Sequence, residues 1–212
     1  MIGGEVLEFG SGTGRHAALL VESGYRVHGI ERSTEMLARA VRVDGFTCQQ
    51  GDICNVNIGR KFDAVFALFH VFSYLTTNIK VKDFFANAKL HLKDNGLLVF
   101  DFWFTPAVCN QGTKVTVKKF IEGPTEVTRI AEPVMRIAEN MVDVNYNVIV
   151  RDTSTEQVEF VRETHSMRHF SLPELDFLAE SFGFERLSAE ELVTGRRPSA
   201  DTWAVCVAMR RR

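Results

Sequence analysis

A short turn near the start of the chain combines three glycines with an acidic residue. The segment Glu8-Phe9-Gly10-Ser11-Gly12-Thr13-Gly14 follows an apolar run and precedes a helical pattern. Glycines at such a turn let the backbone approach a ligand closely, and the amides of a helix N-terminus offer hydrogen-bond donors. The spacing is G-x-G-x-G, and Arg15 stands where a dinucleotide fingerprint has its third glycine. Alone, this turn is weak evidence, since a tight turn without any ligand would also explain it.

Acidic residues around the turn narrow the choice of ligand. Glu8 places a carboxylate beside the glycines, which disfavours a pyrophosphate and favours an ammonium group. Glu31 lies about 20 residues beyond the turn, where an acid can accept hydrogen bonds from both hydroxyls of a ribose. Asp52 could accept from an exocyclic amine, with Ile53 against the face of a ring. An ammonium, a ribose and an adenine without a phosphate describe S-adenosylmethionine. The alternative is that these acids are solvated charges at strand ends.

The elements that must hold these residues alternate between strand and helix. Apolar runs predict strands at 5–9, 26–30, 45–48, 62–67 and 97–100, and helical patterns cover 15–23, 33–41 and 80–92. Such alternation implies a parallel sheet with right-handed crossovers. Ligands of these sheets bind beyond the carboxyl ends of the strands, so the glycines and acids should meet at one edge.

The pattern changes near residue 113. Apolar and polar residues alternate at 114–117 and 141–148, and 157–167 is a further extended run. Period-two alternation is typical of half-exposed antiparallel strands. We therefore predict a small antiparallel β insertion over residues 113–169, after the fifth strand. A helix capped by Ser171 and a last strand at 203–209 follow it.

Composition excludes several classes of protein. The 212 residues are 45% hydrophobic and 25% charged, with a formal charge of −2, so no basic excess points to nucleic acid. No apolar run is long enough for a membrane span, and Met1–Glu5 does not begin a signal peptide. No CxxC pair occurs among the four cysteines, so we expect no metal site and reduced thiols. The chain is predicted to be a single cytoplasmic domain over residues 1–212.

In their order and spacing, these segments resemble the class I S-adenosylmethionine-dependent methyltransferases. The resemblance rests on residues 8–14, 29–31, 51–53, 62–65 and 92–98. It implies an α/β, Rossmann-like seven-stranded sheet of order 3-2-1-4-5-7-6 with strand 7 antiparallel. It also implies S-adenosylmethionine as cofactor and S-adenosylhomocysteine as product. The cofactor-binding residues it implies are Glu8, Gly10, Ser11, Gly12, Gly14, Glu31, Arg32, Asp52, Ile53, Leu68 and Phe69.

The second half resembles a narrower group, the sugar-modifying small-molecule methyltransferases that include dTDP-aminosugar N,N-dimethyltransferases. This resemblance rests on residues 67–75, 100–104 and 163–170. It implies a small-molecule acceptor methylated on N or O, such as a nucleotide-linked sugar or aminosugar. The insertion would form part of the acceptor site and a homodimer contact. Such families carry a longer segment before the first strand, so we expect the cover of the cofactor to be truncated or replaced here.

Three polar residues are candidates for catalysis. Methyl transfer is an in-line displacement, so the protein mainly aligns the acceptor and excludes water. His70 follows the fourth strand and is our first candidate for a base, since histidine titrates near neutral pH. Asp101 ends the fifth strand and could hold a cation or accept a proton, and Tyr74 could orient the acceptor or the cofactor. The alternative for His70 is a loop histidine whose hydrogen bonds are satisfied locally, and the alternative for Tyr74 is ordinary core packing.

Other interpretations stay open at this point. His165 and His169 are four residues apart without a third ligand nearby, so we predict no metal site there. Phenylalanines near the ends of the fourth and fifth strands are either core or an apolar wall beside the sulfonium. The alternative functions are a nucleic-acid or protein methyltransferase and a non-catalytic S-adenosylmethionine-binding partner subunit. Against a nucleic-acid or protein methyltransferase, the sequence has no Asn-Pro-Pro-Tyr-type motif and no basic face.

Overall fold

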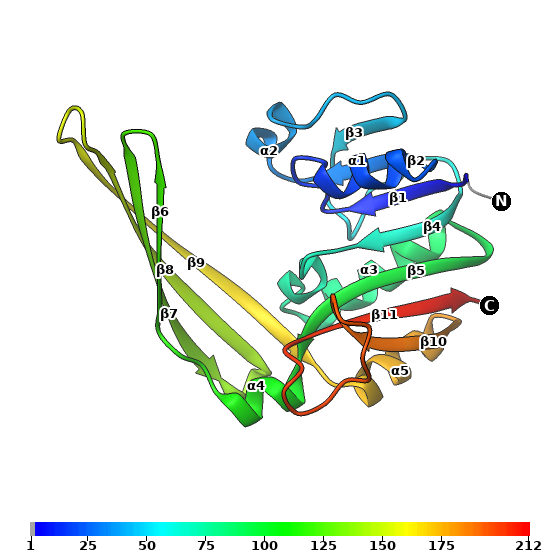
Figure 1. Ribbon diagram of the computed structural model, residues 1–212. Coiled ribbons are helices and arrows are strands. Elements are labelled where there is room, and N and C mark those ends of the chain that lie inside the picture. Colours follow the sequence, from blue (N-terminus) through cyan, green and yellow to red (C-terminus); the bar gives the residue numbers. More distant parts are fainter. Residues whose placement is uncertain (1–2) are drawn as a thin grey trace.

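A mostly parallel sheet with helices packed against it forms the centre of the structure, a computed structural model that describes residues 3–212 (Figure 1). The first two residues of the domain predicted over 1–212 lie outside the described residues. The elements are β1 (Glu5–Phe9), α1 (Arg15–Glu22), β2 (Arg26–Glu31), α2 (Thr34–Ala38), β3 (Phe46–Gln50), β4 (Phe62–Ala67), η1 (Val71–Tyr74), α3 (Asn78–His91), β5 (Leu92–Phe104), α4 (Thr105–Gln111), β6 (Thr116–Glu122), β7 (Thr125–Arg136), η2 (Ile137–Glu139), β8 (Met141–Asp152), β9 (Val158–Phe170), α5 (Leu172–Ser181), β10 (Phe184–Glu191) and β11 (Ala204–Arg211).

The parallel strands bring the predicted site residues to one edge. β1 lies between β2 and β4, with Glu8 opposite Gly29 on one side and Phe66 on the other. β3 pairs with the outer side of β2, and β5 pairs with β4. Beyond β5, the antiparallel β11 pairs with it, and β10 pairs with β11. The carboxyl ends of β1 to β5 therefore share one edge, where such sheets bind ligands.

The prediction of seven strands is wrong, because the insertion joins the same sheet. The structure has an 11-stranded sheet in which the path β3-β2-β1-β4-β5 continues into β9-β8-β7-β6, with β11 and β10 as a second branch from β5. The predicted order thus differs in detail. The physical reason is the length of β5, whose 13 residues pair with β11 and still reach β9 at Trp103 and Phe104.

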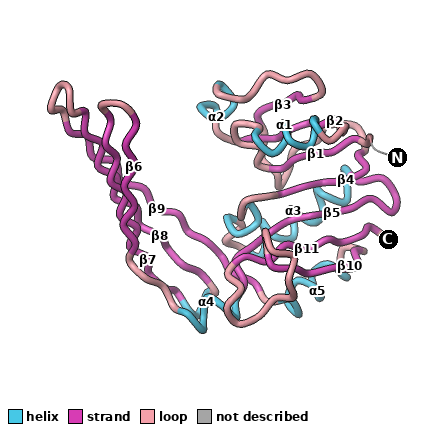
Figure 2. The backbone as a smooth tube through the Cα atoms, viewed as in Figure 1, coloured by secondary structure: helices cyan, strands magenta, loops and turns pink. Residues whose placement is uncertain are grey.

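The strands β6 to β9 form an antiparallel arm that projects away from the rest of the sheet (Figures 1 and 2). The base of the arm has a small core of its own, made of Val108, Ala131, Val142, Val144 and Met167. Towards the tip the arm is a single layer, and all seven residues of β6 are exposed. Within residues 3–212, no helix combines the length and apolar character needed to cross a membrane.

Phenylalanines anchor the segment that follows β4. Phe72 of η1 is fully buried, and its ring centroid lies 4.4 Å from that of Phe100 and 4.7 Å from that of Phe170. Burial of such a ring contributes about 2–3 kcal/mol to folding. Phe102 belongs to the same core, whereas Phe69 is 72% exposed. The aromatic residues near the strand ends are therefore mostly core, and Phe72 fixes the position of its neighbours His70 and Tyr74.

Candidate active site

The glycine loop between β1 and α1 has a shape that only glycine adopts without strain. Gly10, Gly12 and Gly14 have φ angles of 71°, 55° and 77°. A Cβ on Gly10 would lie 2.6 Å from Val71, and one on Gly14 would lie 2.5 Å from Phe46. A Cβ on Gly12 would meet no atom within 4 Å. The packing of the protein itself thus requires Gly10 and Gly14, whereas Gly12 borders open space where a ligand can reach the backbone.

Glu31 ties this loop to the end of β2. Its Oε2 accepts a hydrogen bond from the Gly12 amide at 2.9 Å, and its Oε1 accepts one from the Ser33 amide at 2.8 Å. Ser11 packs against Gly29, where an added Cβ would lie 2.5 Å from the Ser11 hydroxyl. A carboxylate has about four acceptor sites, so Glu31 can still accept from two hydroxyls. The side chain of the neighbouring Arg32 is exposed.

Glu8 is a buried carboxyl group with an unused oxygen. Its residue is 1% exposed, and Oε2 has no hydrogen-bond partner among the described residues. Burial raises the pKa of Glu8 from 4.5 to about 7. Nδ1 of His16, on the first turn of α1, lies 3.7 Å from Oε1. Because an unpartnered buried carboxyl is costly, this oxygen is where a cationic ligand group would be stabilised.

The loop after β3 is held in place by two hydrogen bonds. The Cys54 amide donates to Oδ1 of Asp52 at 2.9 Å, and the Asn87 side chain donates to the Ile53 carbonyl at 2.8 Å. Ile53 packs against the main core. Glu31 lies opposite Gln50 at the adjacent strand ends. The end of β2, which carries Glu31, and the loop that carries Asp52 therefore lie at the same edge of the sheet.

Asp101 shapes the segment after β4. It is fully buried, and its carboxylate accepts hydrogen bonds from the amides of Phe69 at 2.6 Å and His70 at 2.8 Å. Both of these residues have left-handed backbones, with φ angles of 65° and 66°, which is costly for non-glycine residues. Nδ1 of His70 lies 2.6 Å from Oδ2 of Asp101, although without the alignment of a hydrogen bond. Asp101 thus stabilises the strained turn and keeps Nδ1 of His70 towards itself.

The exposed ring of Phe69 connects the two halves of the site. It stacks on His70 with a centroid distance of 5.5 Å and lies 6.3 Å from the ring of His16. Since His16 also faces Glu8, contacts run without a break from β1 through α1 to Asp101 on β5. Leu68, at the end of β4, is half-buried.

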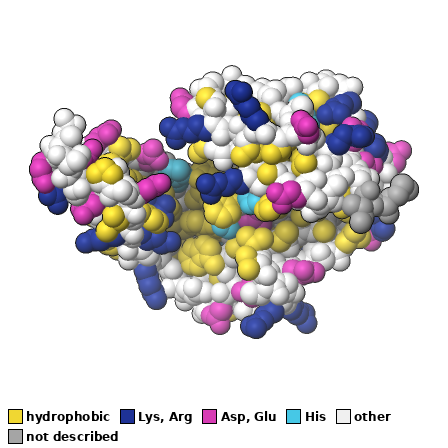
Figure 3. Space-filling view, turned by 45° about the horizontal axis from the view of Figure 1, so that its top comes forward, with side chains coloured by type: hydrophobic (Ala, Val, Ile, Leu, Met, Phe, Trp, Pro, Cys, Tyr) yellow, Lys and Arg dark blue, Asp and Glu magenta, His cyan; other side chains and the backbone are white. Residues whose placement is uncertain are grey.

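Tyr74 belongs to a second polar cluster, which it shares with the arm. Its hydroxyl lies 2.7 Å from Nδ1 of His165, and Nε2 of His165 lies 3.2 Å from a carboxylate oxygen of Glu163. The ring of Tyr146 packs edge-on against His165 at 5.2 Å. Burial raises the pKa of the Tyr74 phenol, and Tyr146 and Glu163 raise it further. Figure 3 shows apolar side chains lining the hollow between the arm and the core, with histidines beside them.

Sequence reasoning missed part of this arrangement. His16 was not predicted as a site residue, although its place two residues after Gly14 on a helix N-terminus was a readable signal. Glu163 and His165 come from a strand whose register against η1 cannot be read from the sequence, and His165 was weighed only as a metal ligand.

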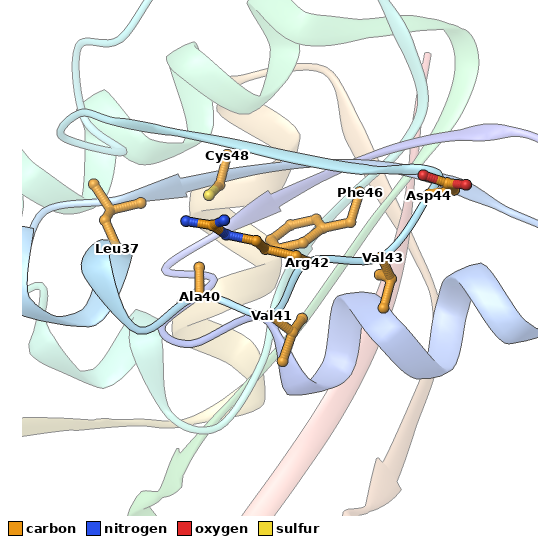
Figure 4. Close-up of a pocket in the computed structure, with 8 residues that line it drawn as sticks. All are labelled: Leu37, Ala40, Val41, Arg42, Val43, Asp44, Phe46 and Cys48. Carbon is orange, nitrogen blue, oxygen red and sulfur yellow. The ribbon is translucent and has the colours of Figure 1, made fainter.

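A separate pocket of about 370 Å³ lies beside the edge strand β3 (Figure 4). Its lining is Leu37, Ala40, Val41, Arg42, Val43, Asp44, Phe46 and Cys48. None of the predicted site residues lines it. The chemistry described above therefore lies elsewhere, at the carboxyl edge of the sheet.

The order of the strands and the glycine loop after β1 define a Rossmann-like α/β domain. Residues 6–96 match a family model described as a methyltransferase domain. This match agrees with the resemblance found in the sequence, since the same residues are similar to methyltransferase domains.

Curated relatives and solved structures agree with this assignment. The chain is 32% identical over 108 residues to a dTDP-3-amino-3,4,6-trideoxy-α-D-glucopyranose N,N-dimethyltransferase of Streptomyces venezuelae, covering 50% of this chain and 46% of the relative. It is 27% identical over 172 residues to a dTDP-3-amino-3,6-dideoxy-α-D-glucopyranose N,N-dimethyltransferase of Streptomyces fradiae, covering 78% and 64%. A methyltransferase structure from Clostridium acetobutylicum superposes with a TM-score of 0.82 at 19% identity, covering 100% of this chain and 85% of that one, which shows the shared fold. The chain thus spans less than two thirds of the length of these curated relatives.

Proposed function

We propose that the protein transfers a methyl group from S-adenosylmethionine to the amino group of a nucleotide-linked aminosugar. The observation that carries this proposal is the open backbone at Gly12, flanked by the Glu31 carboxylate and the unpartnered oxygen of Glu8. The two relatives that act on dTDP-aminosugars support the choice of acceptor.

Each predicted cofactor-binding residue fits one part of the ligand. Glu8 would pair with the ammonium and Glu31 with the ribose hydroxyls, and Asp52 would accept from the adenine amine beside Ile53. Gly10, Ser11, Gly12 and Gly14 would line the methionine part, with Arg32, Leu68 and Phe69 at the rim. S-adenosylmethionine would supply a methyl group on a sulfonium, and the neutral thioether S-adenosylhomocysteine would be the leaving group.

His70 is the proposed base for the acceptor amine. Nδ1 of the imidazole lies 2.6 Å from Oδ2 of Asp101, which leaves Nε2 to take a proton from the acceptor. The same carboxylate fixes the backbone on which His70 sits, so Asp101 acts by positioning. Tyr74 orients the acceptor from the opposite side of the hollow.

The arm is proposed to complete the acceptor site and to form a homodimer contact. Its strand β6 exposes Val117, Phe120 and Ile121, which are 57%, 52% and 75% exposed. An exposed edge strand with apolar side chains is a natural place for another chain to pair. The cytoplasmic location stays a prediction.

Turnover of a defined acceptor tests this proposal. The purified chain is incubated with S-adenosylmethionine and dTDP-3-amino-3,6-dideoxy-α-D-glucopyranose, and the sugar nucleotide is analysed by mass spectrometry. We expect products that carry one and then two added methyl groups. His70→Ala should lower kcat by about 100-fold while affinity for S-adenosylhomocysteine is retained. Full activity of this variant would exclude His70 as the base, and absence of methylation by the wild type would refute the acceptor.

A further inference from the structure

Three side chains from distant parts of the chain form a hydrogen-bonded series between η1 and the arm. Tyr74 stands on η1, whereas His165 and Glu163 stand on β9, and the link between Tyr74 and His165 joins residues 91 positions apart. His165 and Glu163 are two residues apart on a strand, so they share one face of the arm. The proposed roles of Tyr74 and the arm do not explain why this series ends on a carboxylate.

The carboxylate sets the direction of every proton in the series. Ionised Glu163 can only accept, so Nε2 of His165 carries the hydrogen and donates it to Glu163. In neutral imidazole the other nitrogen is then a bare acceptor, so the Tyr74 hydroxyl donates to Nδ1. The raised pKa of the Tyr74 phenol keeps that hydrogen in place. The oxygen of Tyr74 therefore faces any ligand with lone pairs only.

This direction matters for an amine acceptor. A nucleophilic amine needs its single lone pair for the methyl group, while its N–H groups are free to donate. A hydroxyl that pointed its hydrogen at the amine would occupy that lone pair and oppose the reaction. A hydroxyl oxygen that presents lone pairs would instead accept an N–H and leave the nucleophilic lone pair free.

We propose that Glu163 and His165 are positioning residues that turn the Tyr74 hydrogen away from the acceptor, so that Tyr74 binds an amine by its N–H and leaves its lone pair free. This inference rests on the proposed function for its kinetic consequence. Two further residues of the arm lie beside the series. Tyr146 of β8 packs against His165, and the guanidinium carbon of Arg129 lies 5.2 Å from the centroid of the Tyr146 ring.

The orientation of the series can be measured without any acceptor. In protein labelled with ¹⁵N-histidine, the shifts of His165 should show the tautomer with hydrogen on Nε2, assigned by comparison with His165→Phe. Glu163→Gln should weaken this preference, because an amide can also donate. Glu159→Gln, on the same face of β9 but further towards the tip, is the matched control and should leave the His165 shifts unchanged. A hydrogen on Nδ1 in the wild type would overturn the proposal.

The kinetic test compares single and double variants with dTDP-3-amino-3,6-dideoxy-α-D-glucopyranose as the amine probe. His165→Phe frees the Tyr74 hydrogen and should lower kcat by about 10-fold, the value of one hydrogen bond. Removing the same hydroxyl in Tyr74→Phe/His165→Phe should restore part of that loss, because the opposing hydrogen is removed although the accepting oxygen is lost with it. Affinity for S-adenosylhomocysteine should stay unchanged in all variants.

Two results would separate the possible failures. If the double variant is no faster than His165→Phe, or if His165→Phe matches the wild type, the positioning role is refuted. If the wild type does not methylate the probe, the proposed function fails, and the tautomer of His165 still decides the orientation of the series.

Discussion

Ionisation of Glu8 should make the ligand-free protein less stable as the pH rises from acid to neutral. The residue is 1% exposed, and burial raises its pKa from 4.5 to about 7. Below the lower value both the folded and the unfolded chain hold the proton. Between the two values the unfolded chain loses it first, so stability falls with increasing pH and levels off above about pH 7. The gap between the two pKa values corresponds to about 3 kcal/mol.

The substitution Glu8→Gln removes this cost, because glutamine stays neutral. In thermal unfolding of the ligand-free protein, the variant and the wild type should differ little at about pH 4.5 and by about 3 kcal/mol at about pH 8, in favour of the variant. For a chain of this size, that is a shift in Tm of about 6–12 °C. Glu22→Gln at the exposed end of α1 is the matched control and should stay within about 0.5 kcal/mol of the wild type at every pH.

Ligand binding should reverse the preference. A cationic group at the unpartnered oxygen favours ionised Glu8, so binding of S-adenosylhomocysteine at about pH 6.5 should release protons. Calorimetry in two buffers of different ionisation enthalpy measures this release, which Glu8→Gln should lack. A stability difference between variant and wild type that does not change with pH would refute the reasoning.

Four further substitutions test single positions in the site. Glu31→Ala removes the acceptor of the Gly12 amide and should weaken S-adenosylhomocysteine binding by about 10- to 100-fold in calorimetry; unchanged affinity would exclude it from the ribose role. Asp101→Asn replaces an acceptor-only group that faces two amides and should lower unfolding free energy by about 2–3 kcal/mol in urea titrations, which equal stability would contradict. Gly12→Ala should cost about 1 kcal/mol of stability from backbone strain alone, whereas Gly14→Ala should cost more because its methyl group would meet Phe46; equal urea midpoints would contradict this.

The carboxyl edge of the sheet was predictable because local signals and spacing agree there. The turn has a left-handed backbone at Gly10, Gly12 and Gly14, which favours glycine at these positions. The acidic residues Glu8 and Glu31 flank the same turn. A parallel sheet then brings successive strand ends together without further information. The family match over residues 6–96 covers this same region.

The placement of the arm and the contacts of Asp101 depended on tertiary packing that sequence patterns do not encode. Alternation indicated the strands of the arm, but within residues 3–212 only two strand pairs, Trp103 with His169 and Phe104 with Phe170, join it to the core sheet. The helix α4 has seven residues and the strand β10 alternates weakly, so neither gave a periodic signal. Asp101 was predicted at the end of a strand. Its hydrogen bonds to the backbone of Phe69 and His70 could not be predicted, because neither residue type favours a left-handed backbone.

The central claim is that the carboxyl edge of the sheet binds S-adenosylmethionine through Glu8, Glu31 and the open backbone at Gly12. The most direct measurement is calorimetric titration of the wild-type chain with S-adenosylhomocysteine at neutral pH, with Glu31→Ala beside it. The structure predicts one site per chain with a Kd below about 100 μM, and weaker binding by the variant. Absence of binding by a folded wild type, or equal affinity of the two proteins, would contradict the account.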